Sequence, residues 1–407
     1  MTADADRVAD LVEHVEAGEL RLHELADHTD SDTAAAVRRQ VVATASDADC
    51  EAIGDYGFPA EVAEPNIENM IGTVQVPLGV VGPVDINGGA LDDKRYLPLA
   101  TTEGALLASV NRGCSVINKA GGATARVTKA GMTRAPVFSV TDVAEALALV
   151  EWVRDNETAL REAAEETTSH GELQDVTPYV VGNNVYLRFQ YDTKDAMGMN
   201  MVTIATKAAC EVVESETAAS LVALSGNLCT DKKPAAINAV EGRGRSVTAD
   251  VVVPSEVVDT LDTTPEAIAE INTRKNLLGS AKAGALGFNA HVANPVAAMF
   301  LATGQDEAQV VEGANAITTA EETDDGDLYM SVSLASLEVG TVGGGTKLPT
   351  QSEALEILGV AGGGEPAGSN ADALAEAIAV GALAGELSLL AALGSRHLSS
   401  AHESLGR

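Results

Sequence analysis

The sequence has 407 residues, of which 45% are hydrophobic and only 3% aromatic. It is too long for a small disulfide-stapled domain and too apolar for a disordered chain, so two or three domains are expected. The formal net charge is −34, and such a surface would repel nucleic acids and anionic membranes. Lysine is scarce, with ten residues against sixteen arginines. Salt at about 1 M shortens the Debye length to about 3 Å, so the repulsion between the acidic side chains would be screened there. The charge therefore predicts a host that accumulates salt.

The four cysteines are widely spaced and form no CxxC or Cys/His cluster, so neither a disulfide framework nor a metal site is expected. The acidic N-terminus lacks the apolar core of a signal peptide, and no uninterrupted apolar run reaches the ~20 residues of a membrane span. The most apolar stretch, 379–394, contains Glu386 and predicts a buried helix. We therefore expect a soluble, cytoplasmic protein.

In chain order, residues 1–64 predict a small acidic helical domain, because apolar residues between positions 8 and 15 recur at helical spacing. Prolines and glycines divide 64–84 into short β-rich pieces, which predicts strands and tight turns. Residues 101–119 predict a helix that Thr101 or Thr102 could cap.

The composition changes near Pro136, where PVFSV predicts a strand. An acidic amphipathic helix is predicted over 141–167, two strands around a Gly-Asn-Asn turn over 177–191, and a second helix over 199–215. This order is most of a ferredoxin-like split βαβ unit, so an inserted domain is predicted at 136–223.

The remainder of the chain predicts small-residue helices at 276–285 and 290–303, glycine-rich turns at 340–346, and a flexible segment at 359–372. A final apolar helix leads to a polar C-terminal end.

Two positive segments stand out in this acidic chain. Residues 101–136 hold five basic residues and only one acid, Glu103, and residues 225–246 hold four basic residues and two acids. Arginines and lysines beside glycine-rich backbone suit phosphates and carboxylates, which favours a site for a polyanionic small molecule over solvated surface charge. Neither a GxGxxG turn after a strand nor a GxxxxGK[ST] motif is present.

DAMGMNM at 195–201 places methionines at a predicted helix entrance, where a phosphate and a flat ring could bind, although methionine is often core filler.

Long motifs between about Glu64 and His402 resemble one family, 3-hydroxy-3-methylglutaryl-CoA (HMG-CoA) reductase, in its class I branch. They occur in the family's order and include ENMIGTVQVPLGVVGP, PLATTEGALLASVNRGC, GGATARVTKAGMTRAP, DAMGMNM, SGNLCTDKKPAAINAVEGRGRSV, NAHVANPVAAMFLATGQDEAQ, DLYMSVSLASLEVGTVGGGT and AGELSLLAALGSRHL. With the charge, the resemblance suggests a halophilic archaeal source.

The resemblance implies an α+β fold with three parts. These are a small N-terminal helical domain (1–64), a large helix-rich α/β catalytic domain with a central helix (65–135 and 224–407), and an inserted ferredoxin-like NADPH-binding domain (136–223). It also implies a homodimer or homotetramer whose active sites lie between subunits. The family's membrane anchor has no counterpart in the sequence.

The implied reaction is the reduction of HMG-CoA by two NADPH to mevalonate and CoA, through a hemithioacetal and mevaldehyde. The carbonyl oxygen gains negative charge, so a positive donor is required beside it. By motif match this donor is Lys232, and Asp306 would hold its ammonium group. Glu103 matches the catalytic acid, at a predicted helix start. His402 matches the histidine that protonates the departing CoA thiolate, in preference to His397.

Other matches imply binding roles. The HMG group would contact Arg134, Ser225, Asp231, Lys233, Lys275 and Asn294. Positions on the CoA side are Asn111, Arg112, His291 and Ser388. The NADPH site would include Arg126, Asp195, Met197, Gly198, Met199 and Asn200, with Arg126 a partner for the 2′-phosphate. Ser115 and Ala125 depart from animal relatives at phosphate-side positions. The alternatives are a class II, NADH-preferring degradative enzyme and a non-catalytic CoA- or nucleotide-binding protein.

Overall fold

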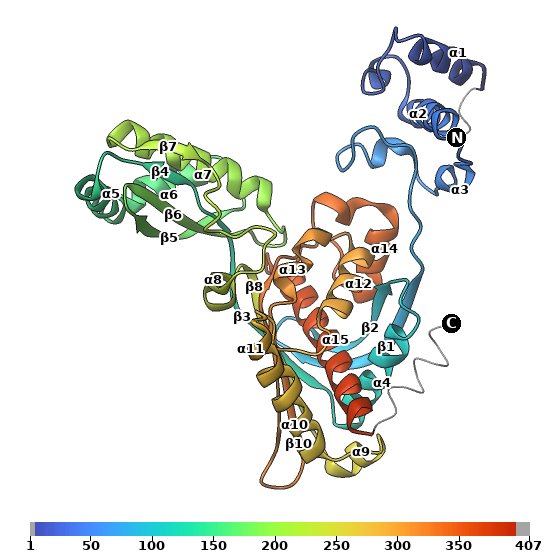
Figure 1. Ribbon diagram of the computed structural model, residues 1–407, viewed down its shortest axis with the longest axis vertical. Coiled ribbons are helices and arrows are strands. Elements are labelled where there is room, and N and C mark those ends of the chain that lie inside the picture. The colour runs from blue at the N-terminus through green and yellow to red at the C-terminus, as the bar shows by residue number, and fades with distance from the viewer. Residues whose placement is uncertain (1–4, 396–407) are drawn as a thin grey trace.

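The computed structural model describes residues 5–395, and it shows a mixed α/β protein (Figure 1). The expected residue His402, and its alternative His397, lie outside the described residues. Three groups of elements are visible in Figure 1: N-terminal helices, a central body around one long helix, and a smaller sheet covered by helices.

The N-terminal group is helical, as predicted. It contains α1 (Ala5–Glu16), α2 (Ser31–Ser46) and α3 (Glu51–Gly54), with short 3₁₀ turns at Glu24–Asp27 and Ala60–Val62. Asp30 caps α2 by accepting the backbone N–H of Thr33 at 2.9 Å. These helices bury their own small apolar cluster, and Figure 1 shows them joined to the body by an extended segment.

The central body is built on one sheet. Its strands are β1 (Leu78–Gly88), β2 (Asp92–Ala100), β3 (Ala123–Arg134), β8 (Gly244–Val253), β9 (Ala316–Glu322) and β10 (Leu328–Leu337). β1 and β2 form an antiparallel hairpin, and β1 lies parallel to β3. β3, β8, β10 and β9 then continue as an antiparallel series. The far end of β3, Met132–Arg134, pairs with β6 and so joins this sheet to the second one.

Helix α15 (Ser369–Gly394) runs through the centre of the body (Figure 1). By length and composition it could cross a membrane, but 78% of its apolar window is buried inside the protein. Gly113 of α4 (Leu106–Lys119) permits close packing, because a Cβ there would lie 1.9 Å from the carbonyl oxygen of Ala384. The prediction of a buried apolar helix around Glu386 is therefore confirmed.

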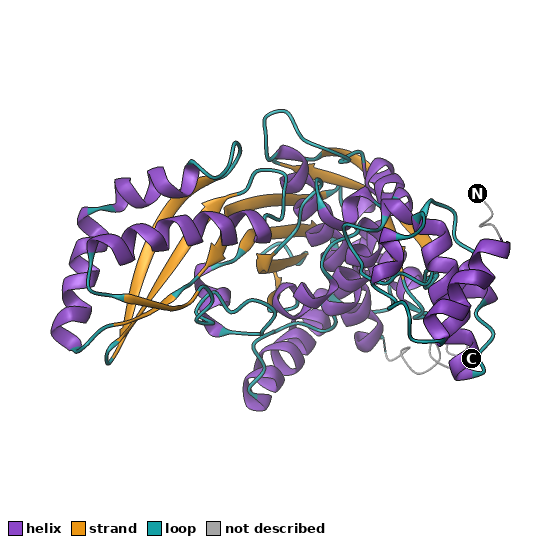
Figure 2. Ribbon diagram, turned by 90° about the horizontal axis from the view of Figure 1, so that it is seen from above, coloured by secondary structure: helices purple, strands orange, loops and turns teal. Residues whose placement is uncertain are grey.

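The second sheet holds β4 (Val137–Ser139), β5 (Glu172–Val181), β6 (Asn184–Asp192) and β7 (Ser220–Ala223). Its helices are α5 (Val143–Asp155), α6 (Glu157–Glu165) and α7 (Met199–Glu216), and Figure 2 shows them running beside the strands. Strands and helices share a separate apolar core. The prediction of a single helix over 141–167 is wrong, because two helices meet at Asn156. The Asn156 side chain donates to the Trp152 carbonyl at this interruption. β5 also begins five residues earlier than predicted.

The remaining helices surround the body. They are α8 (Ala236–Glu241), α9 (Ser255–Asp259), α10 (Pro265–Ile271), a π-helix (Asn272–Gly279), α11 (Ser280–Ala283), α12 (Ala293–Thr303), α13 (Val310–Gly313) and α14 (Pro349–Leu358), with 3₁₀ turns at Glu307–Gln309 and Gly344–Lys347. The helix predicted at 276–285 is thus the end of a longer helical run that begins at Pro265 and contains the π-helix. The helix predicted from 101 begins only at Leu106, and neither predicted threonine caps it.

Candidate active site

The loop between β7 and α8 brings Lys232 against Asp306. The Lys232 Nζ lies 2.7 Å from Asp306 Oδ2, and their side chains are 45% and 28% exposed. The hydrogen bond to Asp306 raises the pKa of Lys232 above its usual value, although partial burial opposes this. The contact therefore keeps a charged ammonium group at a position that a small molecule can reach.

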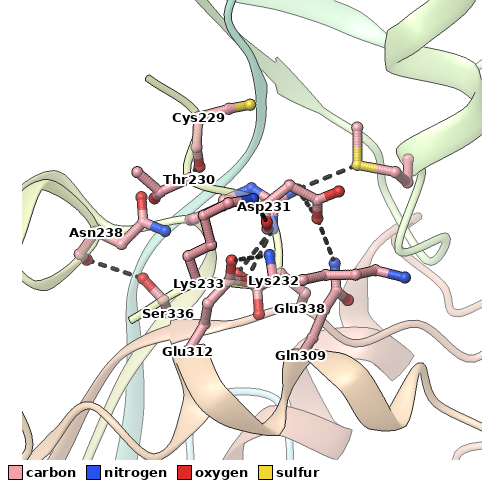
Figure 3. A network of polar contacts seen from close by, with 12 residues as sticks. Cys229, Thr230, Asp231, Lys232, Lys233, Asn238, Gln309, Glu312, Ser336 and Glu338 are labelled. Atoms are coloured by element: carbon pink, nitrogen blue, oxygen red, sulfur yellow. Dashed lines mark hydrogen bonds and ion pairs between the residues drawn. The ribbon is translucent and has the colours of Figure 1, made fainter. Parts of the chain in front are cut away.

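The backbone of this loop is held in an unusual conformation. Lys232 has a φ of 59°, in the left-handed region that side chains rarely adopt, and Asn227 and Thr230 share this property. The Lys232 N–H donates to Glu312 Oε1 at 2.6 Å (Figure 3). The Lys233 ammonium turns back to the Asp231 carbonyl at 3.0 Å. Two adjacent lysines thus point in different directions from one anchored turn.

Beneath the loop lies Arg243, whose side chain is fully buried. It contacts Asp231 at 3.0 Å, Glu312 at 2.9 Å and Glu338 at 3.2 Å. Asp231 also accepts from Gln309 Nε2 at 3.3 Å (Figure 3). The sequence analysis assigned a role to Asp231 but none to Glu312 or Glu338, and it included Arg243 only as a basic residue of the positive segment 225–246. The available signal for the two glutamates was their position inside otherwise apolar stretches.

The DAMGMNM segment forms the entrance to α7, as predicted. Gly198 is the N-cap residue with a φ of 86°, and a Cβ there would lie 2.4 Å from the Thr193 side chain, so glycine is required. Met197 and Met199 are half-buried and pack against the core of the second sheet, whereas Asn200 is exposed. This leaves backbone and side-chain atoms of the segment available at a helix N-terminus.

Asp195 has its carboxylate occupied by backbone groups. Oδ2 accepts the N–H groups of Gly364 and Gly368 at 2.9 and 2.8 Å, and Oδ1 accepts those of Asn370 and Ala371 at 3.0 and 3.1 Å. These donors lie before and within the first turn of α15. Asp195 therefore ties the entrance of α7 to the start of the central helix.

Arg126 lies in β3. Its Nη1 donates to the carbonyls of Asn87 and Ala125, both at 2.6 Å, while the residue remains exposed. The neighbouring β1–β2 turn is fixed by the buried Glu376 of α15, which accepts the N–H groups of residues 89–91. No ion pair occupies Arg126 within residues 5–395.

The residues expected on the CoA side gather around α15. Arg112 Nε donates to Ser388 Oγ at 2.9 Å, and Asn111 accepts the Gly82 N–H at 3.0 Å. The backbone N–H of His291 donates to Glu386 Oε1 at 2.6 Å. The buried ring nitrogen Nε2 of His291 has no hydrogen-bond partner among residues 5–395.

The residues expected to contact the HMG group are spread over several elements. Arg134 ends β3, and its buried Nε has no partner among the described residues. Lys275 lies in the π-helix, and its Nζ contacts the buried Asn276 at 3.2 Å. Asn294 lies in the first turn of α12. The Ser225 hydroxyl lies 3.7 Å from the Cys229 sulfur.

Glu103 does not belong to the hydrogen-bond network of the Lys232–Asp306 pair in the described chain. It is exposed, precedes α4, and donates its N–H to Thr101 Oγ1 at 3.1 Å. Within the described part of the chain, no hydrogen bond or ion pair connects its carboxylate to Lys232 or Asp306. Of the three expected catalytic residues that the structure describes, the single chain brings Lys232 and Asp306 into contact. Glu103 is the third.

Comparison with known proteins identifies the family. Residues 34–407 match the family model for hydroxymethylglutaryl-coenzyme A reductase. The chain is 78% identical over 400 residues to 3-hydroxy-3-methylglutaryl-coenzyme A reductase of Haloferax volcanii, covering 98% of this chain and 99% of that protein. It is 70% identical over 404 residues to the protein of the same name from Halobacterium salinarum, covering 99% and 100%.

A solved structure shares the fold. The class II 3-hydroxy-3-methylglutaryl-CoA reductase of Streptococcus pneumoniae, bound to NADPH in open conformations, aligns with a TM-score of 0.67 at 21% identity, covering 88% of this chain and 96% of that one. From the family model and the full-length relatives together, the chain belongs to the hydroxymethylglutaryl-coenzyme A reductase family.

Proposed function

We propose that this protein reduces (S)-HMG-CoA to (R)-mevalonate and CoA with two molecules of NADPH. The reaction consumes two hydrides and two protons, and it passes through a mevaldyl-CoA hemithioacetal and mevaldehyde. The observation that carries the proposal is the 2.7 Å contact between Lys232 and Asp306 in two motifs of the family. Mevalonate would then feed isoprenoid biosynthesis.

The Lys232 ammonium group suits the chemistry of both reduction steps. Each hydride addition places negative charge on the carbonyl oxygen, and a positive hydrogen-bond donor stabilises that charge. The raised pKa of Lys232 keeps the donor charged at neutral pH, because the bond to Asp306 favours the ammonium form. Asp306 also fixes its direction, since a lysine side chain is otherwise flexible.

The cofactor is proposed to lie between Arg126 and the entrance of α7. NADPH, when bound, supplies the hydride. The fit rests on the exposed Arg126 guanidinium, the backbone N–H groups after Gly198, and the half-buried methionines 197 and 199. Asn200 would add a polar contact. Asp195 would act by holding this entrance in place, because its carboxylate oxygens already accept four N–H groups.

The substrate is proposed to extend from the lysine loop toward α15. Arg134, Asp231, Lys233, Lys275, Asn294 and Ser225 would contact the HMG group. Asn111, Arg112, His291 and Ser388 would contact CoA. Arg134 Nε and His291 Nε2 are buried without a hydrogen-bond partner in the part of the chain that the structure describes, which supports these two placements because buried polar groups are rarely left unsatisfied.

We also propose the assembly that these residues require. Glu103 lacks a contact with Lys232 in one chain, so a homodimer or homotetramer with shared active sites would bring it to the pair as the proton donor. His402 would protonate the CoA thiolate. The three-domain division, the class I assignment, a cytoplasmic location and a halophilic archaeal source belong to the same proposal, and the two haloarchaeal relatives support the last.

The test is an assay of NADPH consumption with HMG-CoA in concentrated KCl, with thiol release measured in parallel. We expect two NADPH oxidised for each CoA released, and a lower rate with NADH. Faster turnover with NADH would favour the class II alternative. Binding of HMG-CoA and NADPH with no consumption would favour the non-catalytic alternative and would contradict the proposal.

A further inference from the structure

Arg243, at the turn before β8, is the largest fully buried side chain of the described protein and connects two distant segments. Its Nη1 contacts Glu312 and Glu338, and its Nη2 contacts Asp231 and the sulfur of Met199 at 3.0 and 3.1 Å. Asp231 belongs to the lysine loop, and Met199 is the first residue of α7. One guanidinium group therefore touches both the proposed substrate loop and the proposed cofactor segment.

Glu312 extends this connection to the backbone of Lys232. Its Oε2 accepts from Arg243 at 2.9 Å, and its Oε1 accepts the Lys232 N–H at 2.6 Å (Figure 3). The Lys232 φ of 59° is unfavourable for a residue with a side chain, so an outside contact must hold it. Because the conformation of Lys232 decides where its ammonium group lies, Glu312 sets the direction of that group.

Negative groups outnumber the positive group in this cluster, and a retained proton reduces the excess. Three carboxylates surround one guanidinium, and Glu312 and Glu338 are both fully buried. Burial, together with a hydrogen bond to Glu312, raises the pKa of Glu338 well above its usual value, and the opposing effect of Arg243 does not reverse this. With Glu338 neutral, the Arg243 guanidinium pairs mainly with Glu312 and Asp231.

We propose that Arg243 and Glu312 are positioning residues that hold Lys232 in its reactive conformation, and that Arg243 couples this lysine loop to the cofactor segment through Met199. This inference rests on the proposed function, and it assigns a role to residues that contact neither substrate nor cofactor. Arginine suits this position because its planar guanidinium group can donate to several acceptors at once, whereas lysine presents a single point charge.

The experiment compares two matched substitutions, Glu312→Gln and Glu338→Gln. Both replace a fully buried carboxyl group that contacts Arg243, but only Glu312 also accepts the Lys232 N–H. Folded sites are counted by NADPH binding, so that kcat refers to folded protein. We expect Glu312→Gln to lower kcat about 100-fold, as expected when a reacting group is displaced by about 1 Å, and to change the Kd for NADPH less than about threefold. Glu338→Gln should lower kcat at least tenfold less, because an amide resembles a neutral carboxyl group.

Arg243→Lys tests the coupling. We expect it to lower kcat and also to raise the Kd for NADPH about tenfold or more, because it loses the contact with Met199 as well as the loop. If this variant does not fold, Asp231→Asn and Met199→Leu are measured singly, and the coupling is read at the opposite end: Asp231→Asn should raise the Kd for NADPH, and Met199→Leu should lower kcat, because each loses a contact with Arg243. An unchanged Kd for NADPH in Asp231→Asn would remove the coupling.

Three outcomes would overturn the inference. Wild-type kcat in Glu312→Gln would remove its positioning role. Equal losses in Glu312→Gln and Glu338→Gln, or losses that appear only in the melting temperature and the number of folded sites, would assign a purely structural role. Failure of the proposed function looks different, because wild-type protein would then bind NADPH without consuming it in the presence of HMG-CoA.

Discussion

Asp195 offers a quantitative test of how the cofactor segment is held. Replacing it with alanine leaves four backbone N–H groups, those of residues 364, 368, 370 and 371, without an acceptor. Hydrogen bonds to charged groups contribute about 1.5–3 kcal/mol each, but such contributions are not additive. We therefore expect a loss of about 4 kcal/mol in the free energy of unfolding, which is large for one substitution.

The melting temperature gives the assay. An unfolding entropy of about 2 cal/mol/K per residue converts about 4 kcal/mol into a decrease of about 5 °C for a chain of this size. Asp195→Asn keeps one acceptor oxygen, so its free energy of unfolding should fall by about half as much. We also expect a higher KM for NADPH in both variants, because the entrance of α7 is no longer tied to α15. Asp192→Asn is the control, since Asp192 accepts one backbone N–H, from Lys194, and pairs with the Lys194 ammonium group at 2.7 Å in the described structure, so far fewer backbone groups lose an acceptor. A melting temperature of Asp195→Ala within about 1 °C of wild type would refute this reasoning.

Three further predictions concern charge. Arg126→Ala should raise the KM for NADPH much more than the KM for NADH, and unchanged discrimination between them would remove Arg126 from the 2′-phosphate. Glu338 has a folded pKa above its unfolded value of 4.5, so its contribution to stability falls as the pH rises from about 4.5 to that raised pKa. Glu338→Gln should flatten this decline relative to wild type in urea titrations at several pH values, and parallel pH profiles would contradict it. With a net charge of −34, the protein should also gain stability as KCl is raised toward molar concentrations, and undiminished stability at low salt would count against adaptation to salt.

Periodicity and turn residues predicted most elements, but not where they end. The two strands around the Gly-Asn-Asn turn and the helix after DAMGMNM are found as β5, β6 and α7. The break at Asn156 was not predicted, because the amphipathic pattern continues across it. The π-helix at Asn272–Gly279 was also missed. It is accompanied by buried hydrogen bonds in which Asn272 donates to the Thr318 carbonyl and Asn276 donates to Asn272 Oδ1, and neither partner can be read from local sequence.

The candidate site was predicted by motif, whereas the groups that hold it were not. The motifs indicated Lys232 and Asp306, and the structure brings them into contact. Nothing local indicated that Glu376 and Glu386 of the apolar helix α15 accept backbone N–H groups from residues 89–91 and 290–291. Such partners lie far apart in the sequence, so only the folded chain reveals them. The roles of the matched residues, including Glu103 and His402, stay predictions.

Lys232→Ala gives the most direct test of the central claim, that a lysine ammonium held by Asp306 stabilises the developing alkoxide. NADPH oxidation and CoA release are measured together, beside Lys94→Ala, which removes an exposed lysine that pairs with Asp85 on the surface. The account predicts that Lys232→Ala abolishes turnover while HMG-CoA still binds weakly, and that Lys94→Ala keeps wild-type kcat. Turnover of Lys232→Ala at the wild-type kcat would contradict it.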